Sequence, residues 1–276
     1  MADETYLQEL DRLRPPDEAR RIIESRLRTL PTEHVSLPAA VGRVLANDIT
    51  APFDHPPFPA STMDGFAVLA ADASPWREVI GVQAAGSVIE EEVHDGQAVR
   101  IMTGAPIPPG ADAVVPVEQT SPTEDHVIIH AEDVQPGANI RPVGSDLAAG
   151  ELVLSAGTRL EPAHVGLIAS LGIDRVPVGR RPRVSILATG DEVVEPGTPL
   201  APGQIYDANR FSLVAAVTEA GGEVTWAGLA PDNREQLEAL IRERMEIDDI
   251  ILTSGGVSMG DLDLIKAILF DAHDVT

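Results

Sequence analysis

Residues 184–188 read Val-Ser-Ile-Leu-Ala, and the polar loop Thr189-Gly190-Asp191-Glu192 follows them at once. A short run that is almost wholly apolar is typical of a strand buried on both faces of a parallel sheet. The chain repeats this arrangement, because predicted strands at 223–227 and 249–253 are also each followed by a predicted helix. The three helices are expected at about 209–220, 233–245 and 262–270. Three strand–helix units in series predict a parallel α/β domain. A sheet of three strands is thin, so we expect this domain to be incomplete.

The region before this domain has a different character. Prolines crowd residues 51–61, and short β-rich runs separated by turn residues follow, which predicts a small all-β domain. These runs lie at 78–83, 98–102, 113–117 and 127–130. Helices are expected on both sides of it. One covers 5–30, with prolines and acids at 15–18 suited to a first turn, and one covers 162–171 and ends at Gly172.

Composition excludes several classes of function. The 276 residues carry 44 acids against 20 bases, a net charge of −24, which repels nucleic acid and anionic membranes. There is no cysteine for disulfides or thiolate zinc sites. No apolar run is long enough for a membrane span, and the acidic N-terminus does not resemble a signal peptide, so we expect a cytoplasmic protein. An anionic ligand would have to be held by backbone amides, local arginines or a bridging cation.

Two loops at the carboxyl edge of the predicted sheet are the first candidates for a ligand site, since open parallel sheets bind ligands there. One is Thr189-Gly190-Asp191-Glu192, and the other runs from Ser254 through Gly255, Gly256 and Ser258 to Asp263. Glycines allow a close approach of the backbone, and the following helix start offers free amides to an anion. The pattern is neither a Walker loop nor GxGxxG, and it is also that of an ordinary turn.

Acids in these two loops point to a metal. Glu192 and Asp263 are expected at the same sheet edge, where paired carboxylates beside a phosphate cradle typically hold Mg²⁺. The alternative is helix capping, since Asp261 and Asp263 also suit the first turn of the next helix. Within the β-rich region, 59–67 and 100–112 are unusual but read as turns, with Asp64 as a cap and Thr103 at the end of a strand. The seven histidines show no metal-ligand spacing.

Six stretches resemble, in order and spacing, the molybdopterin molybdenumtransferase family, which includes MoeA and the E domain of gephyrin. They are STMDGFAV (61–68), VRIMTGAPIPPGADAVVPVE (99–118), GANIRPVGSD (137–146), RRPRVSILATGDEVVEPG (180–197), GQIYDANR (203–210) and TSGGVSMGDLD (253–263). The resemblance implies a multi-domain fold that combines α/β and β-rich parts. A discontinuous N-terminal α+β domain would comprise 1–50 and 142–178, a β-rich domain would be inserted at 51–141, and an incomplete molybdopterin-binding α/β domain would occupy 179–276.

The resemblance also implies an activity. The family inserts molybdate into adenylyl-molybdopterin and releases AMP to give Mo-molybdopterin, with the help of Mg²⁺ or a similar cation. It further implies a homodimer, whose active cleft lies between the third domain of one subunit and the second domain of the other. A contact with the molybdopterin adenylyltransferase is expected as well.

Carried over by position, the resemblance assigns roles to individual residues. The catalytic residues would be Asp64, Thr103, Glu192 and Asp263, of which Glu192 and Asp263 would also bind the metal. The resemblance also assigns Asp146 and Asp232 to substrate binding. The rest of the substrate would be bound by the two loops already singled out at the sheet edge, through Thr189, Gly190, Asp191, Ser254, Gly255, Gly256 and Ser258.

This chain departs from the family pattern at three positions and at its end. Phe66 stands for a tyrosine, Ser145 for a glutamate and Ala188 for a serine, and we expect all three to be tolerated. The family's lysine- and proline-containing element and its fourth, β-rich domain do not follow, so we expect a C-terminally truncated member. The alternatives are a non-catalytic relative that binds a pterin or a protein partner, and a truncated product unable to fold its last domain.

Overall fold

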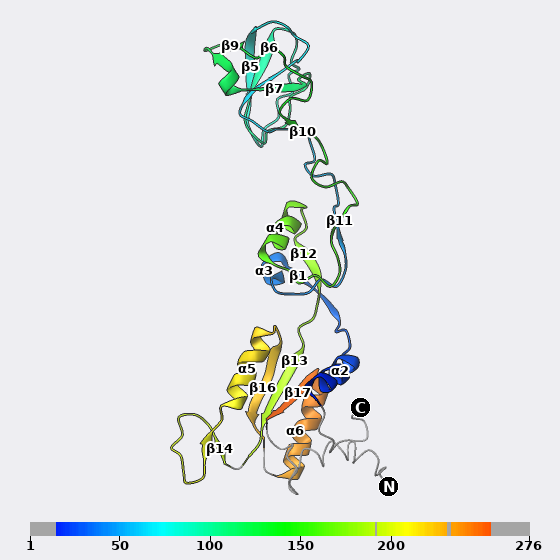
Figure 1. Cartoon of the computed structure of the whole chain (residues 1–276), viewed down its shortest axis with the longest axis vertical. Helices are drawn as coiled ribbons and strands as arrows, with labels where there is room; N and C mark the ends of the chain where they lie inside the picture. Colours follow the sequence, from blue (N-terminus) through cyan, green and yellow to red (C-terminus); the bar gives the residue numbers. More distant parts are fainter. Residues whose placement is uncertain (1–14, 191, 231–232, 255–276) are drawn as a thin grey trace. The chain divides into compact units, whose positions relative to one another are not determined.

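The computed structural model describes residues 15–190, 192–230 and 233–254 (Figure 1). The chain forms two compact units. The α/β unit comprises Met1–Ala46, Arg159–Glu161 and Arg175–Thr276, and the β-rich unit comprises Asn47–Thr158 and Pro162–Asp174. Each unit is built from segments that are far apart in the sequence. The finer division into three domains at 50, 141 and 178 stays a prediction.

The β-rich unit contains a six-stranded mixed sheet in the order β7-β4-β6-β5-β9-β8. Its strands are β4 (Gly65–Val68), β5 (Trp76–Gln83), β6 (Gln97–Ile101), β7 (Ala113–Pro116), β8 (Thr120–Pro122) and β9 (His126–Ile129), with the short helix η1 (Val117–Gln119) before β8. All neighbours are antiparallel except β5 and β6, which are parallel. The four predicted β-rich runs are therefore confirmed as strands β5, β6, β7 and β9.

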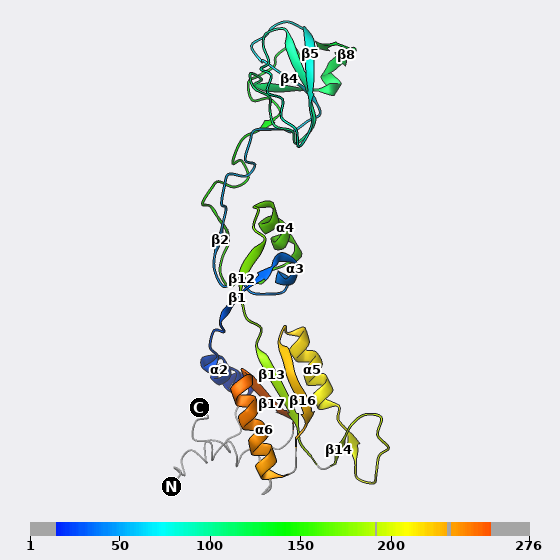
Figure 2. The same cartoon turned by 180° about the vertical axis from the view of Figure 1, so that it is seen from behind.

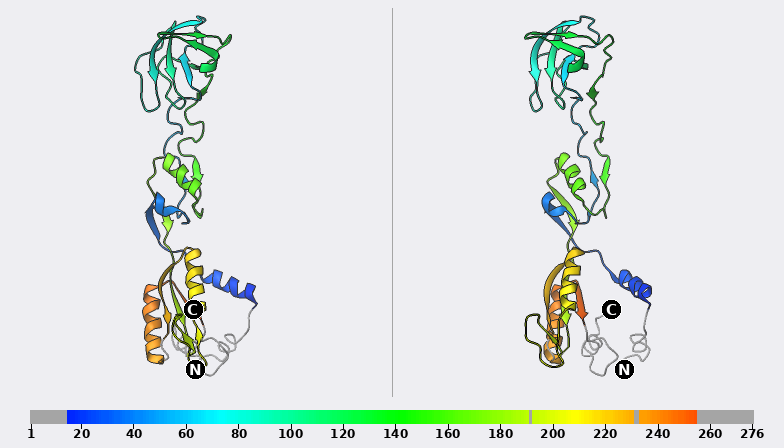
Figure 3. Two further views of the ribbon diagram at one scale, coloured as in Figure 1. Left: turned by 90° about the vertical axis from the view of Figure 1, so that its left-hand side faces the viewer. Right: turned by 60° about the vertical axis from the view of Figure 1, so that its left-hand side comes forward.

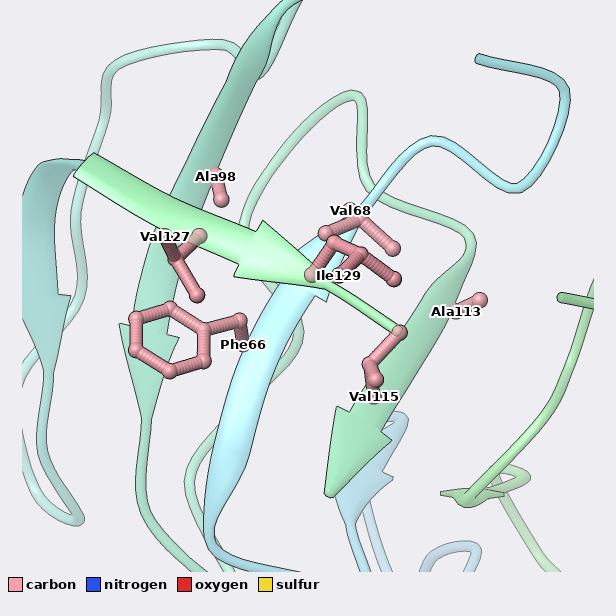
Figure 4. Packing of buried hydrophobic residues seen from close by; sticks show 7 residues of the cluster. All are labelled: Phe66, Val68, Ala98, Ala113, Val115, Val127 and Ile129. Atoms are coloured by element: carbon pink, nitrogen blue, oxygen red, sulfur yellow. The ribbon is translucent and has the colours of Figure 1, made fainter. Parts of the chain in front are cut away.

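Strand β4 was not predicted, although it is an inner strand of the sheet, paired with β7 on one side and β6 on the other. All four of its residues are buried. Phe66 and Val68 pack into one cluster, with Ala98, Ala113, Val115, Val127 and Ile129 (Figure 4). Ala67 packs into a second cluster, with Val93, Val99, Ile101, Ala105 and Val114. Because alternate side chains of a strand point to opposite faces, β4 contributes to both clusters. The reading of 59–67 as a plain turn was thus wrong at 60–61, which form a short strand, and from Gly65 onward.

Two chain segments run side by side to and from the sheet of the β-rich unit (Figures 1 and 2). They form two short antiparallel pairs, β2 (Ile49–Thr50) with β11 (Leu152–Leu154) and β3 (Ala60–Ser61) with β10 (Ile140–Arg141). Between these pairs, the Asp54 carboxylate accepts a hydrogen bond from the backbone N–H of Ala149 at 2.8 Å. The unit also contains α4 (Pro162–Ser170), which matches the predicted helix, and Gly172 follows it with φ of +73°.

The α/β unit begins with α2 (Pro16–Arg26), followed by an antiparallel pair of β1 (Thr32–Ser36) and β12 (Arg175–Gly179), and by α3 (Leu37–Ala40). The helix predicted at 5–30 ends four residues early, at Arg26, because Leu27 is already extended. Pro31 disfavours helical backbone at the residue before it, which explains why the chain does not return to a helix before β1. Residues 1–14 lie outside the described part of the chain.

The parallel sheet of the α/β unit has the order β16-β13-β17. Its strands are β13 (Arg183–Ala188), β16 (Glu223–Leu229) and β17 (Ile250–Ser254), and its helices are α5 (Asn209–Glu219) and α6 (Arg234–Ile247). The three predicted strands and the first two predicted helices are confirmed, while the helix at 262–270 lies outside the described residues. Helices α5 and α6 cover opposite faces of the sheet (Figure 3), and Leu187 packs against Leu237 and Ile241 of α6.

A further excursion leaves the sheet after β13. It contains two short parallel strands, β14 (Val193–Val194) and β15 (Ile205–Tyr206), where the sequence predicted only a polar loop. Among the helices that the structure describes, none has the length and apolar character needed to cross a membrane.

Candidate active site

The carboxyl edge of the parallel sheet carries the first group of predicted site residues. Thr189 directly follows β13, and Ser254 is the last residue of β17. The backbone N–H of Thr189 donates to the Ser254 carbonyl at 3.0 Å, and Thr189 Oγ1 lies 3.4 Å from the same oxygen. The two predicted binding residues are therefore in contact, because they leave neighbouring parallel strands at one edge.

Glu192 is held close to Gly190 in the same loop. Its side chain is exposed, and a Cβ added to Gly190 would lie only 2.7 Å from Glu192 Oε2. Gly190 also has φ of +134°, a conformation that favours glycine. The Glu192 carbonyl accepts a hydrogen bond from the N–H of Ile205 at 2.8 Å, which ties the loop to β15. Glycine is thus favoured at 190 by its backbone conformation, whereas the Glu192 carboxylate is the end of a flexible, exposed side chain that could move aside from a Cβ.

Several predicted site residues lie outside the described residues. They are Asp191, Asp232, Gly255, Gly256, Ser258 and Asp263. The expected convergence of Glu192 and Asp263 on one metal therefore stays a prediction.

Asp64 and Thr103, which are far apart in the sequence, are in direct contact in the β-rich unit. Asp64 Oδ1 accepts hydrogen bonds from both the backbone N–H and the Oγ1 hydroxyl of Thr103, each at 2.7 Å. The backbone bond and then the hydroxyl bond lower the pKa of Asp64 below its ordinary value, and nearby Arg100 adds a smaller effect in the same direction. Asp64 is therefore an exposed, ionised carboxylate whose orientation Thr103 fixes.

The two loops that carry this pair are joined by their backbones. The N–H of Gly104 donates to the Ser61 carbonyl at 2.8 Å, and the N–H of Ser61 donates to the Ala105 carbonyl at 2.9 Å. Ser61 is buried, and its hydroxyl donates to the Met63 carbonyl at 2.6 Å, just before Asp64. The sequence had first suggested that Asp64 caps a turn, but its side chain bonds to Thr103 of another loop.

Gly65 explains why a glycine follows Asp64. A Cβ at this position would lie 2.1 Å from the carbonyl oxygen of Val115 in the neighbouring strand β7, far closer than atoms can approach. Phe66 then enters the core with only 1% of its surface exposed, and the guanidinium of Arg100 lies 5.4 Å from the centre of its ring. The phenylalanine that replaces the expected tyrosine therefore keeps the packing role of the ring.

Asp146 lies near the β3–β10 pair of the same unit. Its Oδ1 accepts a hydrogen bond from Arg141 Nη2 at 2.5 Å, and its backbone N–H donates to the His55 carbonyl at 3.0 Å. The carboxylate is exposed and contacts neither Asp64 nor Thr103 through any hydrogen bond in this fully described region. The structure thus pairs Asp64 with Thr103 but leaves Asp146 in an ion pair of its own.

One buried charged group was missed by the sequence reasoning. Arg210, at the start of α5, is 7% exposed and Asp207 is 4% exposed. Arg210 Nε donates to Asp207 Oδ2 at 2.7 Å, and Arg210 Nη2 donates to Glu195 Oε1 at 2.5 Å. Burial alone would lower the pKa of Arg210, but the bonds to Glu195 and Asp207 outweigh it and raise that pKa. In the sequence, Asp207 and Arg210 stood out only as part of the family-like stretch GQIYDANR. The spacing of charged residues does not show that they are buried.

Comparison with known proteins identifies the family. Residues 14–172, more than half of the chain, match the family described as MoeA N-terminal region (domain I and II). The chain belongs to the MoeA family. Residues 185–275 also match the family described as a probable molybdopterin binding domain. The family resemblance drawn from the sequence is confirmed.

Relatives with established names agree with this membership of the MoeA family. Over 86% of its length the chain is 43% identical to the molybdopterin molybdenumtransferase of Haemophilus influenzae. Over 92% it is 42% identical to molybdopterin molybdenumtransferase 2 of Mycobacterium tuberculosis. The crystal structure of the molybdopterin biosynthesis MoeA protein from Pyrococcus horikoshii OT3 superposes with a TM-score of 0.78 at 36% identity, covering 88% of this chain and 67% of that one. The chain spans only 59% and 64% of the lengths of the two named enzymes.

The candidate residues fall into both MoeA matches. Asp64, Thr103 and Asp146 lie in the N-terminal match, and Thr189, Gly190, Glu192 and Ser254 lie in the molybdopterin-binding match. Within residues 15–190, 192–230 and 233–254, no three His, Asp or Glu side chains are grouped so that they could hold a metal ion. The carboxylate of Glu192 fits Mg²⁺ chemically, but further oxygen ligands would have to come from elsewhere, such as Asp263 or the substrate.

Proposed function

We propose that this chain contributes to molybdenum cofactor biosynthesis as a molybdopterin molybdenumtransferase. The proposed reaction inserts molybdate into adenylyl-molybdopterin and releases AMP, leaving Mo-molybdopterin. The observation that carries the proposal is the bond between Asp64 Oδ1 and Thr103, because it joins two separately matched stretches of the family in one contact. Asp64 Oδ2 accepts no hydrogen bond from the described residues, so it is free to receive a donor from a substrate.

The edge of the parallel sheet is proposed to bind the phosphate and pterin end of the substrate. Thr189 and Ser254 bring two loop starts together, and Gly190, which has no side chain of its own, follows Thr189 with the Glu192 carboxylate close by. Backbone amides at such an edge bind anions without adding positive side chains, which suits a protein with a net charge of −24. Asp191, Gly255, Gly256 and Ser258 are proposed to extend this binding surface, together with Asp146 and Asp232.

Mg²⁺ is proposed to be held by Glu192 and Asp263. When bound, it would neutralise charge on the pyrophosphate and make AMP a better leaving group. The exposed Glu192 carboxylate, supported by Ile205 through its backbone, supplies one ligand from a fixed loop. Thr103 holds Asp64 ionised and oriented through two hydrogen bonds, so Asp64 remains an acceptor at neutral pH.

The assembly and location are also proposed from the family. We propose a homodimer in the cytoplasm, a contact with the molybdopterin adenylyltransferase, and three domains divided near residues 50, 141 and 178. The dimer is open to direct measurement by light scattering.

The decisive experiment measures AMP release from adenylyl-molybdopterin when molybdate is added, alongside binding of the same substrate. Asp64→Asn keeps the shape of the side chain but removes its charge, and Thr103→Val removes the hydroxyl bond. Both should slow AMP release without preventing folding. Asp133→Asn is the matched control, because this exposed acid of the same unit bonds only with Gln135 among the contacts described.

Three outcomes would decide the proposal. Molybdate-dependent AMP release that both Asp64→Asn and Thr103→Val reduce, with Asp133→Asn unchanged, would support it. Substrate binding without release, in the wild-type chain, would instead favour a non-catalytic pterin-binding relative. Equal release from all variants would remove the Asp64–Thr103 contact from the reaction.

A further inference from the structure

The loop that carries Glu192 is closed by a buried charged clamp to which no role has been given. Strands β14 and β15 form its stem. The Glu192 carbonyl accepts from the N–H of Ile205 at 2.8 Å, and the Val194 carbonyl accepts from the N–H of Asp207 at 3.0 Å. Glu195 directly follows β14, and Asp207 directly follows β15. The two acids therefore mark the ends of the two stem strands.

Arg210 bridges these two ends. Its Nε bonds to Asp207 and its Nη2 bonds to Glu195, so one guanidinium ties both strands. A third donor, Nη1, lies 3.3 Å from the carbonyl oxygen of Ala227 in β16, which fastens the stem to the parallel sheet. The side chains of Arg210 and Asp207 are 9% and 2% exposed, whereas that of Glu195 is 51% exposed. The clamp has a buried half and an accessible half.

The chemistry of the clamp requires arginine. A planar guanidinium carries five N–H donors in fixed directions, so it can serve two carboxylates and a carbonyl at the same time. A lysine ammonium would keep the charge but could not reach all three acceptors in this geometry. A buried ion pair adds little net stability over apolar packing, so its presence here points to a demand for defined geometry.

We propose that Arg210 is a positioning residue for Glu192, acting through Glu195 and Asp207 to fix the stem of the loop that presents this carboxylate. This inference rests on the proposed function, in which Glu192 is a metal ligand. Only Val193 and Val194 separate Glu192 from Glu195, which Arg210 holds. If Glu195 were released, the backbone at Glu192 would therefore be less tightly held in place. The proposed role of the clamp is therefore indirect, through the backbone between Glu195 and Glu192.

Glu195 offers the cleanest test, because it is the exposed half of the clamp. Glu195→Ala removes both the charge and the hydrogen-bond acceptor, whereas Glu195→Gln removes the charge but keeps an acceptor oxygen for Arg210. The matched controls are Glu238→Ala and Glu238→Gln on α6, where Glu238 pairs with Arg242 at 2.8 Å on the surface. Glu192→Ala serves as the reference for loss of the ligand itself. Thermal unfolding of every variant establishes that it is folded.

The primary readout is binding of Mn²⁺ alone, measured as free Mn²⁺ by electron paramagnetic resonance in a titration of the whole chain. Loss of a group that orients a metal ligand typically weakens metal affinity by about 10-fold or more. We expect about a 10-fold loss for Glu195→Ala and a clearly smaller loss for Glu195→Gln, since a neutral acceptor still bonds to Arg210, though more weakly. The Glu238 variants should bind as the wild type does. In the AMP-release assay, Glu195→Ala should raise the Mg²⁺ concentration for half-maximal rate and leave the rate at saturating Mg²⁺ unchanged.

The outcomes separate this inference from the proposed function. Equal losses in Glu195→Ala and Glu195→Gln would mean that only charge matters, and would overturn the positioning role. Loss of Mn²⁺ binding in Glu192→Ala with none in Glu195→Ala would overturn it too, while leaving the metal assignment intact. Unchanged Mn²⁺ binding in Glu192→Ala would refute the metal assignment itself, and the inference would fall with it.

Discussion

Replacing Gly65 with alanine should destabilise the β-rich unit selectively. Gly65 follows Asp64 and pairs with Ile101 of β6 and Pro116 of β7. The new Cβ would lie 2.1 Å from the Val115 carbonyl oxygen, 2.9 Å from its carbon and 3.0 Å from the α-carbon of Pro116. All three are backbone atoms, so no side chain can turn away. Strands β4 and β7 would have to separate by about 1.3 Å to restore ordinary contact.

The size of the effect follows from that overlap. Overpacking in a rigid core costs about 1–3 kcal/mol, and the close contact with three backbone atoms of β7 places Gly65→Ala at the upper end, at about 3 kcal/mol. For a domain of this size each kcal/mol lowers the unfolding midpoint by roughly 4 °C, so a drop of roughly 12 °C is expected. The two tryptophans provide the assay, because Trp76 lies in β5 of the β-rich unit and Trp226 in β16 of the α/β unit. Variants that retain one tryptophan each, with phenylalanine in place of the other, report the two units separately.

The Trp76 transition should move, and the Trp226 transition should stay in place. The matched control is Gly166→Ala in α4 of the same unit, where a Cβ would meet no atom within 4 Å. In a helix this change is expected to stabilise by roughly 0.5–1 kcal/mol. A Gly65→Ala variant as stable as the wild type by Trp76 fluorescence would refute the steric argument. So would equal shifts of both transitions.

Three further outcomes are expected. Arg77 has a side chain that is 2% exposed, and its guanidinium donates to the backbone carbonyls of Leu69, Asp72 and Ser74. Arg77→Met should leave these carbonyls without their donor and destabilise the β-rich unit by about 3 kcal/mol, measured by urea unfolding. The hydrogen bond from Arg180 is the main cause that lowers the pKa of Asp249. The stabilisation that comes from ionised Asp249 is thus fully present above the pKa that Asp249 has in the unfolded chain. It is lost as the pH falls through the lower pKa that Asp249 has in the folded protein. The unfolding midpoint of Asp249→Asn should therefore vary less than that of the wild type below about pH 4, and identical pH profiles would contradict this. Light scattering should give twice the 29.2 kDa chain mass, and the chain mass alone at micromolar concentration would contradict the proposed homodimer.

Much of the fold could be predicted from short stretches of sequence, because hydrophobic periodicity and composition are properties of neighbouring residues. Strand β13 shows its burial in its own six residues, and Asn233 occupies the helix-capping position that its type favours, where it accepts hydrogen bonds from Glu235 and Gln236. Strand β4 has only four residues and follows a turn-like Met-Asp-Gly, so it gave no comparable signal.

The site was harder to predict because its contacts join distant residues. Asp64 and Thr103 meet only because β4 pairs with β6, which no local pattern specifies. The family resemblance pointed to both residues, but only the structure shows the hydrogen bonds between them. Arg210 shows the opposite case, since its sequence stretch was recognised while its burial between two acids was not.

The short pairing of β3 with β10 has a consequence for how such a chain can be rearranged. Ser61 and Ile140 face each other in register, and paired residues of antiparallel strands lie about 5 Å apart. The two ends of the segment 62–139 are therefore close together in space. Geometrically, this segment can be deleted and replaced by a tight turn, or exchanged for another domain, without a need to stretch the chain on either side.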